Sequence, residues 1–208
     1  SKRLNGLLPP LTQEQALEVA AISSLSLKGF DTKDWLHRPF RAPHHTASAA
    51  ALVGGGTPPQ PGEISLAHHG VLLLDELPEF QKRVLDTLRE PLESGHITIS
   101  RAGYQTEFPA RFQCIATMNP CPCGYYGDTS GRCRCTEEQA RRYMNRVSGP
   151  LLDRFDLQIT VPALPPQHLW ENNTPQESSQ SIQKRIRKAH QFQKQRHPVA
   201  NAYLSEKE

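Results

Sequence analysis

A run of four apolar residues followed by two acids constrains the fold of this chain more than any other feature. Residues 71–74 read Val-Leu-Leu-Leu, and Asp75 and Glu76 follow directly. A short run without polar alternation is typical of a strand that is buried on both faces of a parallel sheet. Such a strand would place the two carboxylates at its carboxyl end.

Helices are predicted on both sides of this strand in the sequence. A capping box that begins at Thr12 opens a helix over about residues 11–25. Apolar residues at helical spacing predict a second helix over residues 80–92. Pro91 should kink the last turn of this second helix, and Gly95 should end it.

Further strands complete the predicted pattern. Alternating β-branched and aromatic residues predict a hairpin over residues 96–110, a strand over 112–117 and another strand over 156–161. Residues 38–62 are rich in proline and glycine, and we expect a loop there instead of a continuous helix or a central strand. The alternation of strands and helices indicates an α/β domain with a largely parallel sheet flanked by helices.

The length of 208 residues suits one domain with a small extension. Hydrophobic residues make up 37% of the chain, which supports one core of ordinary size and excludes a largely disordered protein. No run approaches the roughly 20 apolar residues that cross a bilayer, and no secretory leader opens the chain. We therefore expect a cytoplasmic protein without a membrane partner. We expect residues 1–165 to form the α/β core and residues 166–208 to form a linker and a basic helix.

Basic side chains are concentrated near the end of the chain, although the net charge of +3 is too small to indicate nucleic-acid binding by itself. No acid lies between Ser181 and His197, whereas six basic residues do. They are Lys184, Arg185, Arg187, Lys188, Lys194 and Arg196. Ile182 and Ile186 give the same segment an apolar edge, so we expect a helix that docks through one side and exposes a cationic face.

The strand at residues 71–74 and its two acids fit a nucleotide site. In P-loop nucleoside triphosphatases an acid at the tip of a buried strand, the Walker B motif, binds the Mg²⁺ that bridges the β- and γ-phosphates. A second acid can polarise the water that attacks the γ-phosphate. Asp75 would have the first role and Glu76 the second. Paired acids also follow strands by chance where a polar turn begins, so the motif alone is weak.

Four segments together resemble one protein family. They are residues 61–80, 88–95, Ala-Thr-Met-Asn-Pro-Cys-Pro-Cys-Gly at 116–124 and Ser-Gly-Pro-Leu-Leu-Asp-Arg-Phe-Asp at 148–156. In this order they resemble the Mg-chelatase-like AAA+ family, and within it the bacterial competence proteins. The resemblance implies a P-loop NTPase core with inserted β-hairpins and the start of a helical lid domain. It also implies ATP and Mg²⁺ as cofactors, and a hexameric ring in the full-length parent.

The resemblance assigns roles to further residues of the chain. Asn119 matches the sensor that hydrogen-bonds the attacking water or the γ-phosphate, although an asparagine before a proline is also a common turn residue. Arg154 matches the arginine finger that reaches into the nucleotide site of a neighbouring subunit, a task that suits the always-charged guanidinium. An ion pair of Arg154 with Asp153 or Asp156 is the plainer alternative. Arg146 is a weaker second candidate for the finger.

The predicted hairpin over residues 96–110 resembles an insertion that faces the central pore in related ring motors, and residues 54–69 resemble its companion insertion. Arg101, Tyr104 and Arg111 offer cations and an aromatic ring, which could contact a nucleic-acid backbone and stack on bases. The expected partner is single-stranded or branched DNA. A solvated hairpin without a ligand is the alternative.

Four cysteines form a CxC pattern that repeats after a gap of nine residues. They are Cys121, Cys123, Cys133 and Cys135. Four thiolates could bind Zn²⁺ tetrahedrally, and Gly124 would allow the loop to turn tightly over the ion. The spacing departs from the commoner CxxC knuckle, so reduced thiols without a metal are the alternative. Cys114 lies in a predicted strand and is expected in the core.

Two histidine pairs also look like metal ligands. They are His44 with His45 and His68 with His69. Adjacent residues on a strand point to opposite faces, so we do not expect a shared ion and interpret both pairs as structural.

The chain contains no Gly-x-x-x-x-Gly-Lys-Ser/Thr loop, which supplies the backbone cradle and the lysine for the phosphates in P-loop proteins. By the resemblance, residues 1–8 correspond to the end of the helix that follows this loop. We therefore expect a fragment that binds ATP poorly and does not hydrolyse it alone. Its parent would be an ATPase that drives DNA branch migration or remodelling in transformation and recombination. The alternatives are the ATPase subunit of a magnesium chelatase and a zinc-stabilised nucleic-acid-binding module.

Overall fold

The chain divides into two compact units. The first comprises residues 11–163, and the second comprises residues 1–10 with residues 164–208. The computed structural model describes residues 2–101, 104–128, 131–162, 177–197, 201 and 204.

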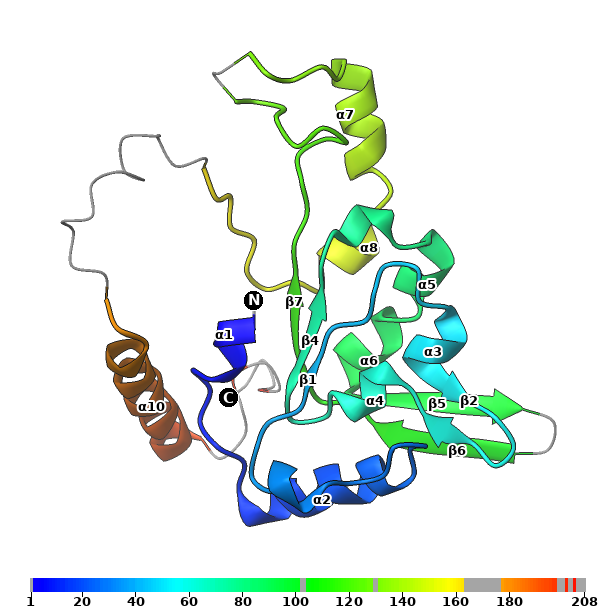
Figure 1. The fold of residues 1–208 in the computed structure, drawn as a ribbon, viewed down its shortest axis with the longest axis vertical. Helices are drawn as coiled ribbons and strands as arrows, with labels where there is room; N and C mark the ends of the chain where they lie inside the picture. Colours follow the sequence, from blue (N-terminus) through cyan, green and yellow to red (C-terminus); the bar gives the residue numbers. More distant parts are fainter. Residues whose placement is uncertain are drawn as a thin grey trace. The chain divides into compact units, whose positions relative to one another are not determined.

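A three-stranded parallel sheet lies at the centre of the first unit (Figure 1). Its strands are β1 (Phe40–Arg41), β4 (Val71–Leu74) and β7 (Gln113–Ala116), in the order β1-β4-β7. All four residues of the central strand β4 are buried, which confirms the prediction of a doubly buried strand. Because β4 and β7 run parallel, the residues that follow them lie at the same edge of the sheet.

Short helices pack on the sheet and enclose the main hydrophobic core. They are α3 (Ala49–Val53), α4 (Glu63–Leu66), α5 (Lys82–Asp86) and α6 (Arg89–Ser94). Leu72 and Leu74 point to the same face of β4. Both belong to one buried cluster with Leu52, Ile64 and Val84 from α3, α4 and α5. Full burial of each such side chain stabilises the fold by about 1.5–3 kcal/mol relative to exposure.

The single helix predicted over residues 80–92 is wrong, because two helices form there. A 3₁₀ turn, η2 (Leu77–Glu79), leads into α5, and the chain re-enters a helix only at α6. Pro91 has no N–H to donate to the carbonyl of Thr87, so the helical ladder breaks where we expected a kink. Gly95 ends α6 in the left-handed region with φ of 74°, as expected for a helix stop.

Two hairpins form beside the core. The predicted hairpin consists of β5 (His96–Arg101) and β6 (Tyr104–Pro109), which are antiparallel. A smaller hairpin pairs β2 (Gly54–Gly55) with β3 (Gln60–Pro61). Figure 1 shows both hairpins on the same side of the unit. Residues 38–62 are therefore more regular than the expected loop, since they contain β1, α3 and this small hairpin.

The strand predicted over residues 156–161 does not form, and these residues have no regular structure. Leu157, Ile159 and Val161 alternate as in a strand, yet each is at least 80% exposed. A strand needs a neighbour to satisfy its backbone N–H and C=O groups. Among the described residues the sheet has the order β1-β4-β7, and residues 156–161 pair with neither of its edge strands.

The first predicted helix is confirmed. α2 (Gln13–Ser24) begins with the expected reciprocal capping box between Thr12 and Gln15. η1 (Thr32–Asp34), α7 (Glu137–Met144) and α8 (Gly149–Leu152) complete the first unit.

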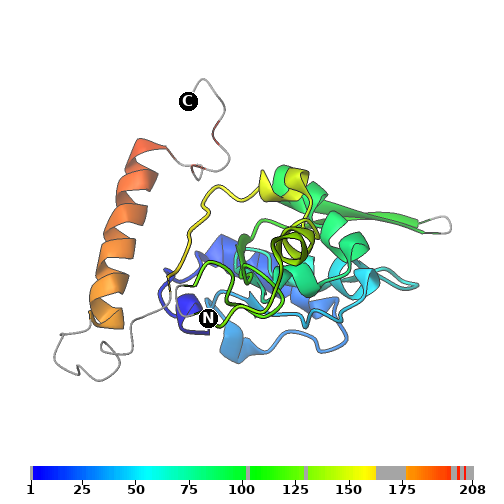
Figure 2. The same cartoon turned by 90° about the horizontal axis from the view of Figure 1, so that it is seen from above.

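The second unit contains α1 (Lys2–Asn5) and the basic helix α10 (Ser179–Arg196). α10 is the orange helix in Figure 2, and it has no buried residue. Ile182 and Ile186 are half-buried on one side of it. In the part of the chain that the structure describes, every helix is too short or too polar to cross a bilayer.

Candidate functional site

Asp75 and Glu76 lie directly after β4, and a threonine from the next strand connects them. Thr117 follows β7, and its hydroxyl donates a hydrogen bond to Asp75 Oδ1. The same hydroxyl oxygen accepts the N–H of Glu76 at 3.2 Å. The Thr117 main chain also bonds to the β4 end, because its N–H donates to the Leu74 carbonyl at 3.0 Å. The two acids are thus held at the edge where both strands end.

Glu76 is exposed and its backbone is in an uncommon conformation. Its φ of 57° and ψ of 53° lie in the left-handed region, which a residue other than glycine rarely occupies. Its N–H bond to Thr117 stabilises this conformation. The carboxylate approaches His45, whose Nδ1 lies 3.6 Å from Glu76 Oε2. The His45 ring also packs edge-on against Phe80, so the imidazole has a defined position beside the acid.

Asn119 lies three residues beyond the end of β7, and its side chain is exposed. The turn at Gly124 approaches it, since a Cβ at Gly124 would lie 4.0 Å from Asn119 Cγ. Gly124 has a φ of 82°, as the tight turn predicted for this glycine requires. Because glycine has no side chain, the Gly124 turn leaves the Asn119 amide accessible on this side.

Arg154 forms an ion pair, but its partner is neither Asp153 nor Asp156. Its Nη2 donates to Glu93 Oε2 of α6 at 2.8 Å, and its Nη1 donates to the Pro150 carbonyl at 3.1 Å. The local alternative that we considered therefore named the wrong partner. Glu93 is 61 positions away in the sequence, so spacing gave no indication of this contact.

Arg146, the second finger candidate, also contacts an acid near the site. Its Nη1 lies 3.3 Å from Glu79 Oε2, and its guanidinium lies 5.7 Å from the centre of the Tyr143 ring. Both ion pairs are partly exposed, and exposed pairs contribute only about 0–1 kcal/mol to stability. Each arginine could therefore leave its acidic partner for another one at little cost in free energy.

The three residues predicted to contact DNA do not lie together. Arg101 and Tyr104 pair opposite each other at the far end of the β5–β6 hairpin, although their side chains lie outside the described part of the structure. Arg111 follows the base of the hairpin, beyond the pair of His96 and Pro109. Five residues of antiparallel strand separate the two ends by about 17 Å. A polymer that touches all three must follow the length of the hairpin.

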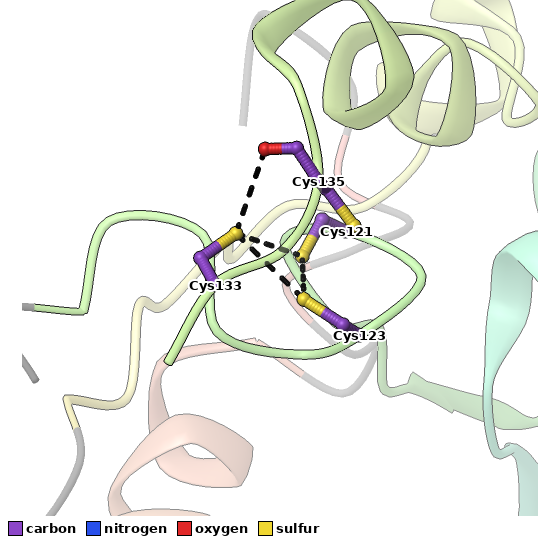
Figure 3. Close-up of side chains that lie close together, drawn as sticks. All are labelled: Cys121, Cys123, Cys133 and Cys135. Atoms are coloured by element: carbon purple, nitrogen blue, oxygen red, sulfur yellow. Dashed lines mark hydrogen bonds between the residues drawn. The ribbon is translucent and has the colours of Figure 1, made fainter. Parts of the chain in front are cut away.

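The four clustered cysteines converge in space (Figure 3). All four sulfur atoms lie within 4.8 Å of one another. Cys121 is buried, whereas Cys123, Cys133 and Cys135 are half-buried. Cys114 lies in β7, apart from these four cysteines. Burial raises the pKa of its thiol to about 12.

His68 and His69 also converge, although we expected adjacent histidines to point apart. They follow α4 in a turn, where the strand argument does not apply, and His69 has a φ of 56°. His68 Nε2 lies 2.9 Å and His69 Nε2 lies 2.8 Å from the same carboxylate oxygen, Glu18 Oε2 of α2. The expectation that these two histidines point to opposite faces was therefore wrong.

The hydrogen bonds of His68 determine its protonation. The Arg111 backbone N–H donates to His68 Nδ1 at 3.0 Å, so Nδ1 carries no proton and Nε2 carries the single proton of a neutral ring. That Nε2–H donates to Glu18. A metal at Nε2 would require the loss of this proton. The group therefore suits a structural link between α2 and the start of β7, which agrees with our structural interpretation of this pair.

The neutral state of His68 predicts a pH dependence of stability. Burial lowers its pKa from 6.5 to about 4. As pH falls below 6.5, the unfolded chain binds a proton that the folded chain does not, so stability is lost between about pH 6.5 and pH 4. Over this pH range the free energy of unfolding should fall by about 3 kcal/mol. Urea unfolding at several pH values should show this loss, and His68→Gln should flatten it.

His37→Gln is the control for this experiment, because His37 is exposed. It should leave the slope of stability against pH unchanged. An equal slope in the chain and in His68→Gln would contradict the assignment of the titration to His68.

Sequence reasoning missed Thr117 and His45 at this edge, and Glu93 as the partner of Arg154. Thr117 alone had a local signal, since a hydroxyl residue at a strand tip can bond to the neighbouring strand's acid. His45 and Glu93 reach their partners from distant segments, so these contacts depend on the tertiary fold.

Comparison with known proteins identifies relatives across the whole chain. A family profile described as "Magnesium chelatase, subunit ChlI" matches residues 1–169. The chain is 54% identical to an uncharacterised protein, YifB, of Salmonella typhimurium over 210 aligned positions, which cover 100% of the chain and 41% of that protein. It is 52% identical to competence protein ComM of Haemophilus influenzae, covering 100% of the chain and 40% of that protein.

A more distant relative is the magnesium-chelatase 38 kDa subunit of Acidiphilium rubrum. The identity is 34% over 70 residues, which are 34% of the chain and 20% of that subunit. The chain thus spans about two fifths of the length of YifB and ComM and shares only a short region with the chelatase subunit. With its α/β core of the P-loop NTPase type, the chain belongs to the Mg-chelatase-like family that includes ComM and YifB.

Proposed function

We propose that the protein containing this chain is an AAA+ ATPase that uses ATP hydrolysis to move or remodel DNA strands. The observation that carries this proposal is the pair Asp75 and Glu76 at the carboxyl edge of the sheet, connected through Thr117. The 52% identity to a competence protein over the whole chain supports the DNA role. That relative is a competence protein, and competence is the uptake of DNA.

The oxygen atoms at this edge suit Mg²⁺. Carboxylate and hydroxyl oxygens are the hard ligands that Mg²⁺ prefers, and Asp75 and Thr117 present one of each within hydrogen-bond distance. Bound Mg·ATP would supply a polarised γ-phosphate. Asp75 would hold the cation, and Glu76, which is exposed at the edge, would accept the proton of the attacking water. Asn119 would orient that water by a hydrogen bond without adding charge.

Arg154 would complete the site of a neighbouring subunit in a ring. An arginine finger stabilises the charge that develops on the transferred phosphoryl group. In the single chain Arg154 pairs with Glu93, so assembly would replace this partly exposed ion pair with a phosphate contact. A hexamer is the assembly that the family resemblance favours.

The β5–β6 hairpin is the proposed contact with DNA. Its length of about 17 Å between the His96–Pro109 pair and the Arg101–Tyr104 pair would let a single strand run along it. The basic residues of α10 provide a second cationic surface, which would strengthen binding in a salt-dependent way.

A magnesium chelatase ATPase subunit is the second candidate, favoured by the 34% identity to the Acidiphilium rubrum subunit. That similarity covers 34% of the chain, against 100% for ComM, so the DNA-remodelling ATPase is the better supported proposal. Stimulation of ATP hydrolysis by single-stranded DNA would favour the ComM-like function. Stimulation by a porphyrin instead would favour the chelatase.

Asp75→Asn tests the nucleotide site in the complete translation product that contains this chain. We expect Mg²⁺-dependent ATP hydrolysis to fall by about 100-fold or more, because loss of even an outer-shell metal contact costs 10–100-fold. Hydrolysis would be measured as phosphate release with and without single-stranded DNA.

Asp86→Asn is the matched control, since Asp86 lies on α5 in a partly exposed ion pair with Arg89. It should keep normal hydrolysis. If Asp75→Asn also hydrolyses ATP at the normal rate, the proposed site is wrong.

A further inference from the structure

The segment from Thr117 to Cys135, between β7 and α7, has no helix or strand in its described residues. Its one buried side chain among these residues is that of Cys121. A loop of this length without regular structure is uncommon in a compact domain, and this one has no apolar core of its own. Some other interaction must offset the entropy lost on ordering it.

The four cysteine sulfurs occupy the centre of this segment. The Sγ atoms of Cys121 and Cys123 are 3.3 Å apart, those of Cys121 and Cys133 are 4.0 Å apart, and those of Cys123 and Cys133 are 3.7 Å apart. Figure 3 shows the Cys135 side chain next to Cys121, and its sulfur lies within 4.8 Å of the other three. All four cysteines are free thiols.

These separations match the ligands of a single tetrahedral ion. A Zn–S bond is about 2.3 Å long, so tetrahedral thiolates lie about 3.8 Å apart. A disulfide would require an S–S distance of about 2.05 Å. An iron–sulfur cluster distributes its cysteines over several iron atoms and therefore separates their sulfurs more widely than one ion does. The geometry favours Zn²⁺ over both.

Backbone donors surround the sulfurs. The N–H groups of Arg134 and Tyr125 donate to Cys123. Such N–H···S bonds spread the negative charge of a tetrathiolate site, as outer-shell groups do in metal proteins. The Arg132 guanidinium lies 4.4 Å from the Tyr125 ring centre and pairs with Asp128 at 2.8 Å, and these two contacts also help to order the loop.

We propose that Cys121, Cys123, Cys133 and Cys135 bind one Zn²⁺ ion, which has a structural role. The ion joins the first CxC pair, which follows Asn119, to the second, which directly precedes the Thr136 cap of α7. The ion thereby connects the loop that contains Asn119 to the N-terminus of α7. Metal binding itself does not depend on the proposed ATPase activity, because metal content and thermal stability report it without nucleotide.

The test begins with the unaltered 208-residue chain, expressed with zinc and purified in metal-free buffers without chelator. Elemental analysis should find about one equivalent of zinc. Replacement by Co²⁺ should give the intense visible absorption of a tetrahedral cobalt thiolate. Removal of the metal by a strong chelator should lower Tm and make four further thiols reactive towards a thiol reagent. These measurements need no variant to fold.

The double variant Cys121→Ser, Cys123→Ser should contain less than about a tenth of an equivalent of zinc. Cys114→Ala is the matched control, because Cys114 is half-buried in β7 and lies outside the cluster, and the variant should keep about one equivalent. Less than about a tenth of an equivalent in the unaltered chain would overturn the proposal. Iron in place of zinc, or an unchanged zinc content in the double variant, would also overturn it.

Discussion

Glu76→Gln in the complete translation product is expected to lower ATP hydrolysis by about 10²–10⁴-fold while ATP binding persists. The range is the usual contribution of a general base. Glutamine keeps the size of the side chain and can still orient water, but it cannot accept a proton. The variant keeps the N–H of residue 76 that bonds to Thr117, so the left-handed backbone should remain as it is. The measurements are phosphate release and calorimetric titration with ATP.

Glu90→Gln is the control for this substitution, because Glu90 is an exposed acid on α6. It should hydrolyse ATP at the normal rate. The outcome that contradicts the role of Glu76 is hydrolysis within a few-fold of normal in Glu76→Gln. A loss of ATP binding that equals the loss of hydrolysis would instead indicate that Glu76 acts in binding.

The centre of the fold could be predicted from sequence because its signals are local. Residues 71–74 are apolar without interruption, and this alone indicates a strand with two covered faces. The capping box at Thr12 and the stop at Gly95 rely on contacts within a few residues. Parallel pairing then places the residues that directly follow β4 and β7 at one edge, as the contact of Asp75 with Thr117 shows.

The failures come from contacts that a local pattern does not contain. The apolar stripe from Phe80 to Leu92 is helical in spacing, but the missing N–H of Pro91 divides it. Residues 156–161 alternate like a strand, but a strand also needs a neighbour to pair with. β1 is two residues long and lies between prolines, so no sequence window is long enough to reveal it.

In the candidate site, too, local features could be predicted and tertiary contacts could not. Residue types at the strand ends could be predicted, whereas the partners of Arg154 and Glu76 could not. Glu93 and His45 come from segments whose distance depends on how α6 and the residues before α3 pack on the sheet. The convergence of His68 and His69 was missed because a turn was treated as a strand.

Gly70→Ala is expected to lower the free energy of unfolding by about 3 kcal/mol or more. A Cβ at Gly70 would lie 2.0 Å from the Pro39 carbonyl oxygen, 2.8 Å from its carbonyl carbon and 2.9 Å from its Cδ. The same Pro39 oxygen accepts the N–H of Val71 at 2.9 Å, which is the first bond between the β1 segment and β4. An alanine must therefore displace the β1 strand from the sheet.

The displacement cannot be absorbed locally, because the other side of Gly70 is also fixed. Its carbonyl accepts the Gln113 N–H at 2.9 Å, where β4 and β7 begin to pair. Gly149→Ala is the matched control, since a Cβ at Gly149 meets nothing within 4 Å, and its stability should change by less than about 0.5 kcal/mol. Urea unfolding followed by circular dichroism compares the two variants. Equal midpoints for Gly70→Ala and Gly149→Ala would mean that the close approach of Pro39 to Gly70 does not limit the sheet.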